Sequence, residues 1–111
     1  MAIKFPQQGD ILLLNFSPTR GSEQRGKRPA LVISPTIYNQ KTGLMLACPI
    51  TTKQKGYPFE LTLPKSCSVH GVVLLDQIRS IDWKTRGFST QDTVPHAWLQ
   101  KASKLLNLLL P

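Results

Sequence analysis

Residues 18–29 (PTRGSEQRGKRP) form a polar stretch whose side chains suit the binding of a phosphodiester. Its cations are Arg20, Arg25, Lys27 and Arg28. Glu23 is the single acid among them, so the like charges repel one another unless an anion binds there. A second stretch, residues 51–57 (TTKQKGY), places two lysines beside hydroxyl and amide groups. Together the two stretches predict a phosphate-binding surface, and they leave phosphodiester cleavage open as its activity.

The overall charge also points to an anionic partner. The chain has 14 Lys and Arg against 6 Asp and Glu, a formal net charge of +8. Such a balance favours nucleic acid, an acidic polypeptide or an anionic membrane surface, although many basic proteins bind no nucleic acid. Residues 105–111 are apolar but too few to cross a bilayer, and the N-terminus has no signal-peptide core. We therefore expect a cytoplasmic protein without a membrane partner.

The cysteines and histidines do not have the spacing of metal ligands. The chain contains two of each: Cys48, Cys67, His70 and His96. They lack the closely spaced pairs that hold zinc in proteins. Cys48 lies inside an apolar run, which predicts a buried and unreactive thiol. We expect neither a metal nor another cofactor.

The elements that position the two polar stretches are expected to be short strands. Five segments have the apolar runs or the alternation typical of strands: residues 11–16, 30–34, 44–50, 59–63 and 71–81. Residues 38–43 have the composition of a turn. Pro95 suits the first turn of a helix, whose apolar face would be Trp98, Ala102, Leu105 and Leu109. The prediction is one domain over residues 1–111, mainly β with an appended C-terminal helix (α+β), folded as a small twisted barrel.

Short motifs across residues 9–87 resemble the MazF/PemK family of toxin endoribonucleases in their order and spacing. They are GD at 9–10, Pro18, GSEQ at 21–24, RP at 28–29, PIT at 49–51, KGYPFE at 55–60, DQ at 76–77 and SIDW at 80–83. The resemblance implies an SH3-like barrel and a homodimer. It also implies metal-independent cleavage of single-stranded RNA within short recognition sequences, inhibited by a cognate antitoxin. Residues 64–70 (PKSCSVH) match no pattern, and no role is carried over to them.

Metal-free cleavage of RNA uses the neighbouring 2′-hydroxyl as nucleophile and leaves a 2′,3′-cyclic phosphate and a 5′-hydroxyl. The protein must relieve charge on the transition state and move two protons. Arg28 matches the family's catalytic arginine, which precedes a proline, and Pro29 biases it toward an extended backbone. Its guanidinium can form a fork with the nonbridging oxygens. The alternative for Arg28 is a structural salt bridge to Glu23 or Asp76.

Two further residues are candidates for the chemistry. Thr51 matches the family's catalytic threonine, and its hydroxyl can donate to the scissile phosphate. Strand propensity is the alternative reason for a threonine there, and Thr52 offers the same chemistry, so only the resemblance favours Thr51. Glu23 can accept the 2′-hydroxyl proton or simply orient Arg28, and both roles remain open. His70 and His96 lie outside both polar stretches and are expected to be structural or on the surface.

The remaining candidates would hold the RNA. Those expected to contact the RNA backbone or base edges are Arg20, Gln24, Lys53, Gln54 and Lys55. Those expected to meet unstacked bases are Phe16, Tyr57 and Gln77. For each of them a plain solvated surface position is the alternative. Trp83 is expected in the core or at a dimer interface rather than on RNA.

Two other functions fit the same scaffold. A gyrase-poisoning toxin would use the same barrel without catalysis, but such toxins need a Trp-Gly-Ile-like C-terminus, and this chain ends in LLLP. A noncatalytic nucleic-acid-binding barrel is favoured by charge alone, and a cleavage assay separates it from a nuclease. The net charge also predicts an acidic, partly disordered antitoxin segment as a protein partner.

Overall fold

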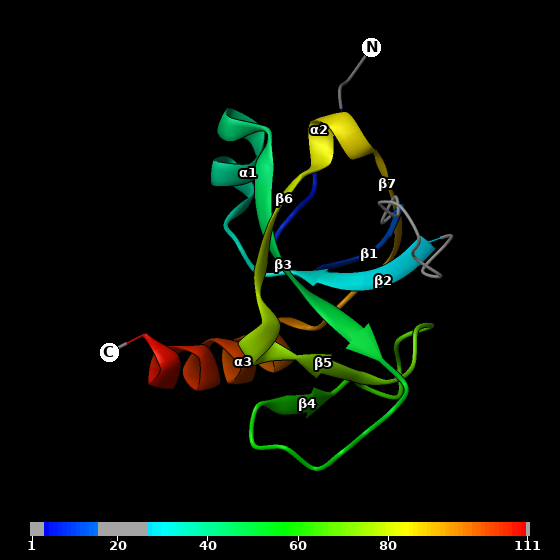
Figure 1. Ribbon diagram of the computed structural model, residues 1–111, viewed down its shortest axis with the longest axis vertical. Coiled ribbons are helices and arrows are strands. Elements are labelled where there is room, and N and C mark those ends of the chain that lie inside the picture. Colours follow the sequence, from blue (N-terminus) through cyan, green and yellow to red (C-terminus); the bar gives the residue numbers. More distant parts are fainter. Residues whose placement is uncertain (1–3, 16–26, 111) are drawn as a thin grey trace, which may run out of the picture.

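The computed structural model describes residues 4–15 and 27–110. These residues form an antiparallel sheet of seven strands with a long C-terminal helix (Figure 1). The strands are β1 (Asp10–Asn15), β2 (Lys27–Val32), β3 (Leu44–Thr51), β4 (Glu60–Thr62), β5 (Val72–Leu74), β6 (Arg79–Asp82) and β7 (Phe88–Thr93). The helices are α1 (Thr36–Thr42), α2 (Trp83–Arg86) and α3 (His96–Leu109), and η1 (Leu75–Gln77) is a single 3₁₀ turn.

Strand β3 is the centre of the sheet. It is eight residues long and pairs with β2, β5 and β6, and the strand order is β4-β5-β3-β2-β1-β7 with β6 attached to β3. β4 and β7 are the two ends of this order, and no pairing between described strands joins them. The mainly β fold with a C-terminal helix is therefore confirmed, whereas the closed barrel is not.

The sheet separates two hydrophobic cores because successive side chains of a strand point to opposite faces. The first core, the inner core, contains Leu12, Leu14, Ala30, Val32, Met45, Ala47, Ile81 and Trp83. The second core, the α3-side core, lies on the other face of the same strands and includes Ile11, Leu31, Cys48 and Val73. Figure 1 shows α3 at the opposite end of the molecule from α1 and α2.

Helix α3 closes the α3-side core with Trp98, Ala102 and Leu106, which recur every four residues and are buried. The indole Nε1–H of Trp98 also donates to the carbonyl oxygen of Thr62 at 2.8 Å. The predicted apolar face holds for Leu105, which is half-buried and packs against the α3-side core, but it is wrong for Leu109, which is 38% exposed. Leu109 is the last residue of the helix.

Two other predicted elements differ from the structure, and one strand was not predicted. The strand predicted at 71–81 is two strands, because η1 turns the chain and buries Leu75 between β5 and β6. Residues 38–43 are the end of α1 and its cap at Gly43 rather than an isolated turn. Asn39 is buried there and its side-chain amide donates to Pro6 O at 2.9 Å, so contacts distant in sequence stabilise the helix. β7 was not predicted, since its sequence FSTQDT has no apolar alternation.

Within the described part of the chain, no helix is long and apolar enough to cross a bilayer.

Candidate functional site

Arg28 and Thr51 lie in adjacent strands, β2 and β3. The two strands pair Ala30 with Pro49 and Leu31 with Cys48, and extending this register by two residues sets Arg28 opposite Thr51. Side chains directly opposite each other in an antiparallel pair point to the same face, with Cβ atoms about 5 Å apart. The fold thus brings together two residues that are 23 positions apart in the sequence. Figure 1 shows β2 beginning and β3 ending on the same side of the molecule.

The face that carries these two side chains continues the inner core. Ala30 and Val32 follow Arg28 at alternate positions of β2, and Met45 and Ala47 precede Thr51 in the same way on β3. All four are buried, so the strands beneath the pair are fixed by close packing. Arg28 itself is exposed and Thr51 is half-buried. The pair therefore stands where the inner core ends and solvent begins.

Arg79 is a further cation on this face, and we did not predict a role for it. It pairs with Ala47 across β3 and β6, and it precedes the buried Ile81 by two positions. By the alternation of a strand its side chain shares the face of Arg28 and Thr51. The sequence pattern that could have indicated Arg79 is a cation two positions before an apolar strand residue, here Ile81, since the two then share one face of the strand.

The hydroxyl group of Thr51 is oriented by the backbone that follows it. The amide N–H of Lys53 donates to Thr51 Oγ1 at 3.1 Å. A hydroxyl that accepts one bond can still donate its own hydrogen, for example to a phosphate oxygen. Thr52 is exposed, and we find no such bond to it among the described residues.

Gly71 fixes the position of the Thr51 backbone. Its φ is +136°, and a Cβ atom built there would lie 2.6 Å from the carbonyl oxygen of Thr51. Any side chain at this position would collide with backbone, which cannot rotate away. Val72, the next residue, pairs with Thr51 across β3 and β5. The chain that contains Thr51 is therefore held from the β5 side as well as from the β2 side.

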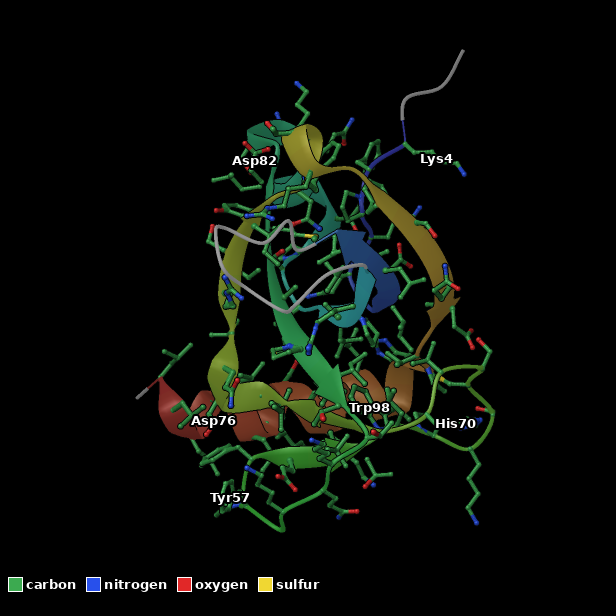
Figure 2. All side chains as sticks on the ribbon, turned by 45° about the vertical axis from the view of Figure 1, so that its right-hand side comes forward. Lys4, Tyr57, His70, Asp76, Asp82 and Trp98 are labelled. Atoms are coloured by element: carbon green, nitrogen blue, oxygen red, sulfur yellow. The ribbon has the colours of Figure 1, made fainter. Side chains whose placement is uncertain are left out.

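Residues 53–57, the basic loop, follow Thr51 and expose all of their side chains. Tyr57 is 61% exposed, so its aromatic ring is available to a ligand. Gln77, at the end of η1, is exposed too. Figure 2 shows Tyr57 and Asp76, the neighbour of Gln77, toward the end of the molecule opposite Asp82. The predicted RNA-contacting residues Lys53, Gln54, Lys55, Tyr57 and Gln77 thus all face solvent.

The other predicted site residues are Phe16, Arg20, Glu23 and Gln24, which lie outside the described residues, so their predicted roles stay predictions. Among the described residues, no ion pair joins Arg28 to Asp76, so that structural role for Arg28 is not observed. His70 and His96 are exposed, as expected. Trp83 is buried in the inner core, where its indole N–H donates to Asn39 O at 3.0 Å, which confirms the core assignment.

The thiols show no sign of reactivity. Cys48 is buried, and burial, with a smaller contribution from the charge of Asp76, raises its pKa to about 12. The group stays protonated at neutral pH, as predicted for a core cysteine. In residues 4–15 and 27–110, no group of three or more His, Cys, Asp and Glu side chains is placed to hold a metal ion.

Comparisons with known proteins place this arrangement in a family. Residues 7–110 match the family described as PemK-like, MazF-like toxin of type II toxin-antitoxin system, and the chain belongs to that family. It is 47% identical over 105 residues to the endoribonuclease toxin MazF of Escherichia coli (strain K12), covering 95% of this chain and 94% of that protein.

Solved structures agree in fold and sequence. The crystal structure of MazF (Form-I) from Deinococcus radiodurans matches with a TM-score of 0.83 and 48% identity, covering 97% of this chain and 98% of that one. The MazE-MazF (Form-II) structure from the same organism matches with a TM-score of 0.85 and 44% identity, covering 97% of both chains.

Proposed function

We propose that this chain is the toxin of a toxin–antitoxin pair and that it cleaves single-stranded RNA within short recognition sequences. The observation that carries the proposal is the register that sets Arg28 opposite Thr51 on one solvent-facing end of the inner core. The names of its relatives, endoribonuclease MazF and endoribonuclease PemK, support the same activity.

In the proposed mechanism the RNA supplies its own nucleophile. The 2′-oxygen forms a bond to phosphorus and loses its proton, the bond from phosphorus to the 5′-oxygen breaks, and that oxygen takes up a proton. The products are a 2′,3′-cyclic phosphate and a 5′-hydroxyl, and no water enters this step. No metal-bound hydroxide is required, because the attacking hydroxyl is already adjacent to the phosphorus.

Arg28 and Thr51 act on the charge that develops during this attack. The guanidinium of Arg28 is always protonated and can donate two parallel hydrogen bonds to the nonbridging oxygens. The hydroxyl of Thr51, oriented by the Lys53 N–H, donates a third. Fixed donors of this kind stabilise a phosphorane-like transition state more than the ground state. Glu23 is the proposed acceptor of the 2′-hydroxyl proton, with the orientation of Arg28 as its alternative role.

The basic loop and Gln77 would hold the strand on either side of the cleaved bond. Lys53 and Lys55 offer cations to phosphates, Gln54 and Gln77 offer amides to base edges, and the exposed ring of Tyr57 offers a stacking surface. Arg20, Gln24 and Phe16 are proposed to contact RNA from the stretch that precedes Arg28.

The proposed assembly is a homodimer in the cytoplasm, neutralised by an acidic antitoxin segment that occupies the RNA site. The net charge of +8 supports an acidic partner. Solved MazE-MazF structures support a protein inhibitor of this class of toxin. A noncatalytic RNA-binding barrel and a gyrase-poisoning toxin are the alternatives.

The deciding experiment maps the ends of RNA after incubation with the purified protein. We expect cuts within a short common sequence, with 2′,3′-cyclic phosphate and 5′-hydroxyl ends, in buffer containing excess EDTA. A single 2′-deoxy substitution 5′ of the cut phosphate should block cleavage but permit binding, because the phosphate and stacking contacts remain. Cleavage of the deoxy substrate, or loss of activity in EDTA, would contradict the mechanism, and intact RNA would contradict the function.

A further inference from the structure

The basic loop is held in shape by one carboxylate, that of Glu60. Its oxygens accept the backbone N–H of Lys55 at 3.1 Å and the backbone N–H of Gly56 at 2.9 Å. The backbone N–H of Glu60 in turn donates to Tyr57 O at 3.2 Å. Glu60 is the first residue of β4, and it is half-buried. A strand end thus closes the loop with both its side chain and its backbone.

The same bonds determine which groups of the loop remain available. With the N–H groups of Lys55 and Gly56 turned toward Glu60, the side chains of residues 53–57 all face solvent. Gly56 has a φ of +79°, a conformation that glycine adopts without strain, and this lets two successive N–H groups converge on one carboxylate. The loop therefore has a defined shape before any ligand arrives.

A carboxylate beside a phosphate-binding loop has an electrostatic cost. Glu60 is one of only 6 acids in a chain of net charge +8, and it lies next to the loop that carries Lys53 and Lys55. Its charge would repel an RNA backbone nearby, and the two N–H groups offset only part of it. The geometry thus sets two effects of Glu60 against each other, the ordering of the loop and the repulsion of RNA.

From this geometry we infer that Glu60 is a positioning residue for RNA binding: it holds residues 53–57 in the RNA-binding shape, and this ordering outweighs its repulsion. The inference rests on the proposed function, because it takes single-stranded RNA as the ligand of the loop. Glu60 acts through the backbone of Lys55 and Gly56, and its side chain makes no hydrogen bond to Arg28 in the described part of the chain. Its removal should weaken RNA binding while leaving the chemical step unchanged.

Three variants separate the two effects. Glu60→Ala removes both the acceptor and the charge. Glu60→Gln removes the charge but keeps one acceptor oxygen. Asp82→Asn is the matched control, because it removes one charge at the opposite end of the molecule, where Asp82 caps α2 (Figure 2).

The first measurement is amide hydrogen exchange of Lys55 and Gly56 in the protein without RNA, together with the thermal unfolding midpoint. We expect Glu60→Ala to speed exchange at both amides by at least about tenfold, Glu60→Gln to speed it less, and Asp82→Asn to leave it unchanged. Unchanged exchange in a folded Glu60→Ala protein would overturn the inference. This measurement needs no RNA cleavage, so it decides the loop-ordering part even if the proposed function fails.

The second measurement is the Kd for a single-stranded oligonucleotide with the 2′-deoxy substitution, with kcat and KM on the cleavable RNA. We expect Glu60→Ala to raise Kd and KM about tenfold, which corresponds to the loss of one charged hydrogen-bond group, with kcat within about twofold of wild type. Glu60→Gln should lie between Glu60→Ala and wild type. Tighter binding by both Glu60 variants would mean that repulsion dominates, and a fall in kcat at constant KM would place Glu60 in the chemistry. Either result would overturn the inference.

Discussion

The two faces of β2 and β3 differ in how their side chains meet solvent, although both faces belong to the same backbone. On one face, Leu31 and Cys48 lie fully buried against the α3-side core. On the other face, the inner core continues outward into Arg28 and Thr51, which reach solvent. Both faces stabilise the fold, but only the second also offers, at its solvent-exposed end, groups that can act on a ligand. Substitutions of Arg28 and of Leu31 should therefore separate activity from stability.

Arg28→Ala should have the largest effect on activity and little on stability. Losing one preorganised charge donor should lower the cleavage rate by about 10²–10³-fold. The denaturation midpoint should stay at the wild-type value because the side chain is exposed. Arg28→Lys should restore little, since an ammonium cannot form the two-bond fork.

Lys84→Ala is the matched control for Arg28→Ala. Lys84 is an exposed cation on α2, so the variant removes the same charge away from the site. Cleavage assays on both purified proteins decide the point. Near-wild-type cleavage by a folded Arg28→Ala protein would remove Arg28 from the mechanism, and equal losses in both variants would reduce its role to net charge.

Leu31→Ala tests the opposite face. Leu31 is fully buried, so its truncation should lower the free energy of unfolding by about 2–5 kcal/mol. Under conditions where the variant is folded, its kcat should stay close to that of wild type. Chemical denaturation and a cleavage assay on the same sample measure both quantities. A large fall in kcat without loss of stability would show that the two faces are not separable.

Thr51→Val should have a smaller effect on activity. Valine keeps the shape and strand propensity but removes the hydroxyl, and the loss of a hydrogen bond to a charged phosphate oxygen, about 1.5–3 kcal/mol, lowers the rate about 10- to 150-fold. Thr52→Val is the control, because it removes a hydroxyl from the exposed residue next to Thr51, and it should leave the cleavage rate unchanged. If Thr52→Val were the slower enzyme, the assignment of the two threonines would be reversed.

The smallest effect on activity is expected from Asp92→Asn. The carboxylate of Asp92, in β7, accepts a hydrogen bond from residues 64–70 and so connects this segment to the strand. Bonds from the backbone N–H of Ser68, at 2.7 Å, and of Thr93 hold the pKa of this carboxyl below its usual value. A group whose pKa is lower in the folded state stabilises the fold above its unfolded pKa of about 3.9, and this stability is lost as the pH falls below that value. Asp92→Asn should therefore flatten the acid limb of the stability curve.

Thermal unfolding midpoints of wild type and Asp92→Asn at pH 7 and pH 3 measure this contribution. The two proteins should differ more at pH 7 than at pH 3. RNA cleavage at pH 7 should be the same in both. An equal gap at the two pH values would mean that Asp92 stabilises the fold without titrating.

Some features of the fold could be read from the sequence because their signal is local. β1 and β3 are apolar runs, and Trp98 and Ala102 of α3 are buried one helical turn apart, as their spacing predicts. β7 could not be found in this way, since it lies at the edge of the sheet and all six of its residues are at least partly exposed. The helical state of residues 38–42 depends on the contact of Asn39 with Pro6, which lies 33 positions away.

The candidate site residues came from the resemblance and stay predictions, whereas the geometry around them could not be predicted from the sequence. Arg28 and Thr51 stood out by resemblance, whereas their juxtaposition depends on the pairing of two strands that α1 separates in the sequence. The roles of Glu60 and Gly71 could not be predicted, since each depends on a contact with a backbone group: the N–H of Lys55 and Gly56 for Glu60, and the carbonyl of Thr51 for Gly71.

The pairing of β2 with β3 also means that the site can form only in a correctly folded chain. A slip of one residue in this register would turn every side chain of β2 to the opposite face. Arg28 would then point away from Thr51, and Leu31 would leave the α3-side core in the same movement. A chain paired out of register is thus both unstable and inactive. The surface that could act on a ligand therefore becomes available only once the native register of β2 and β3 has formed.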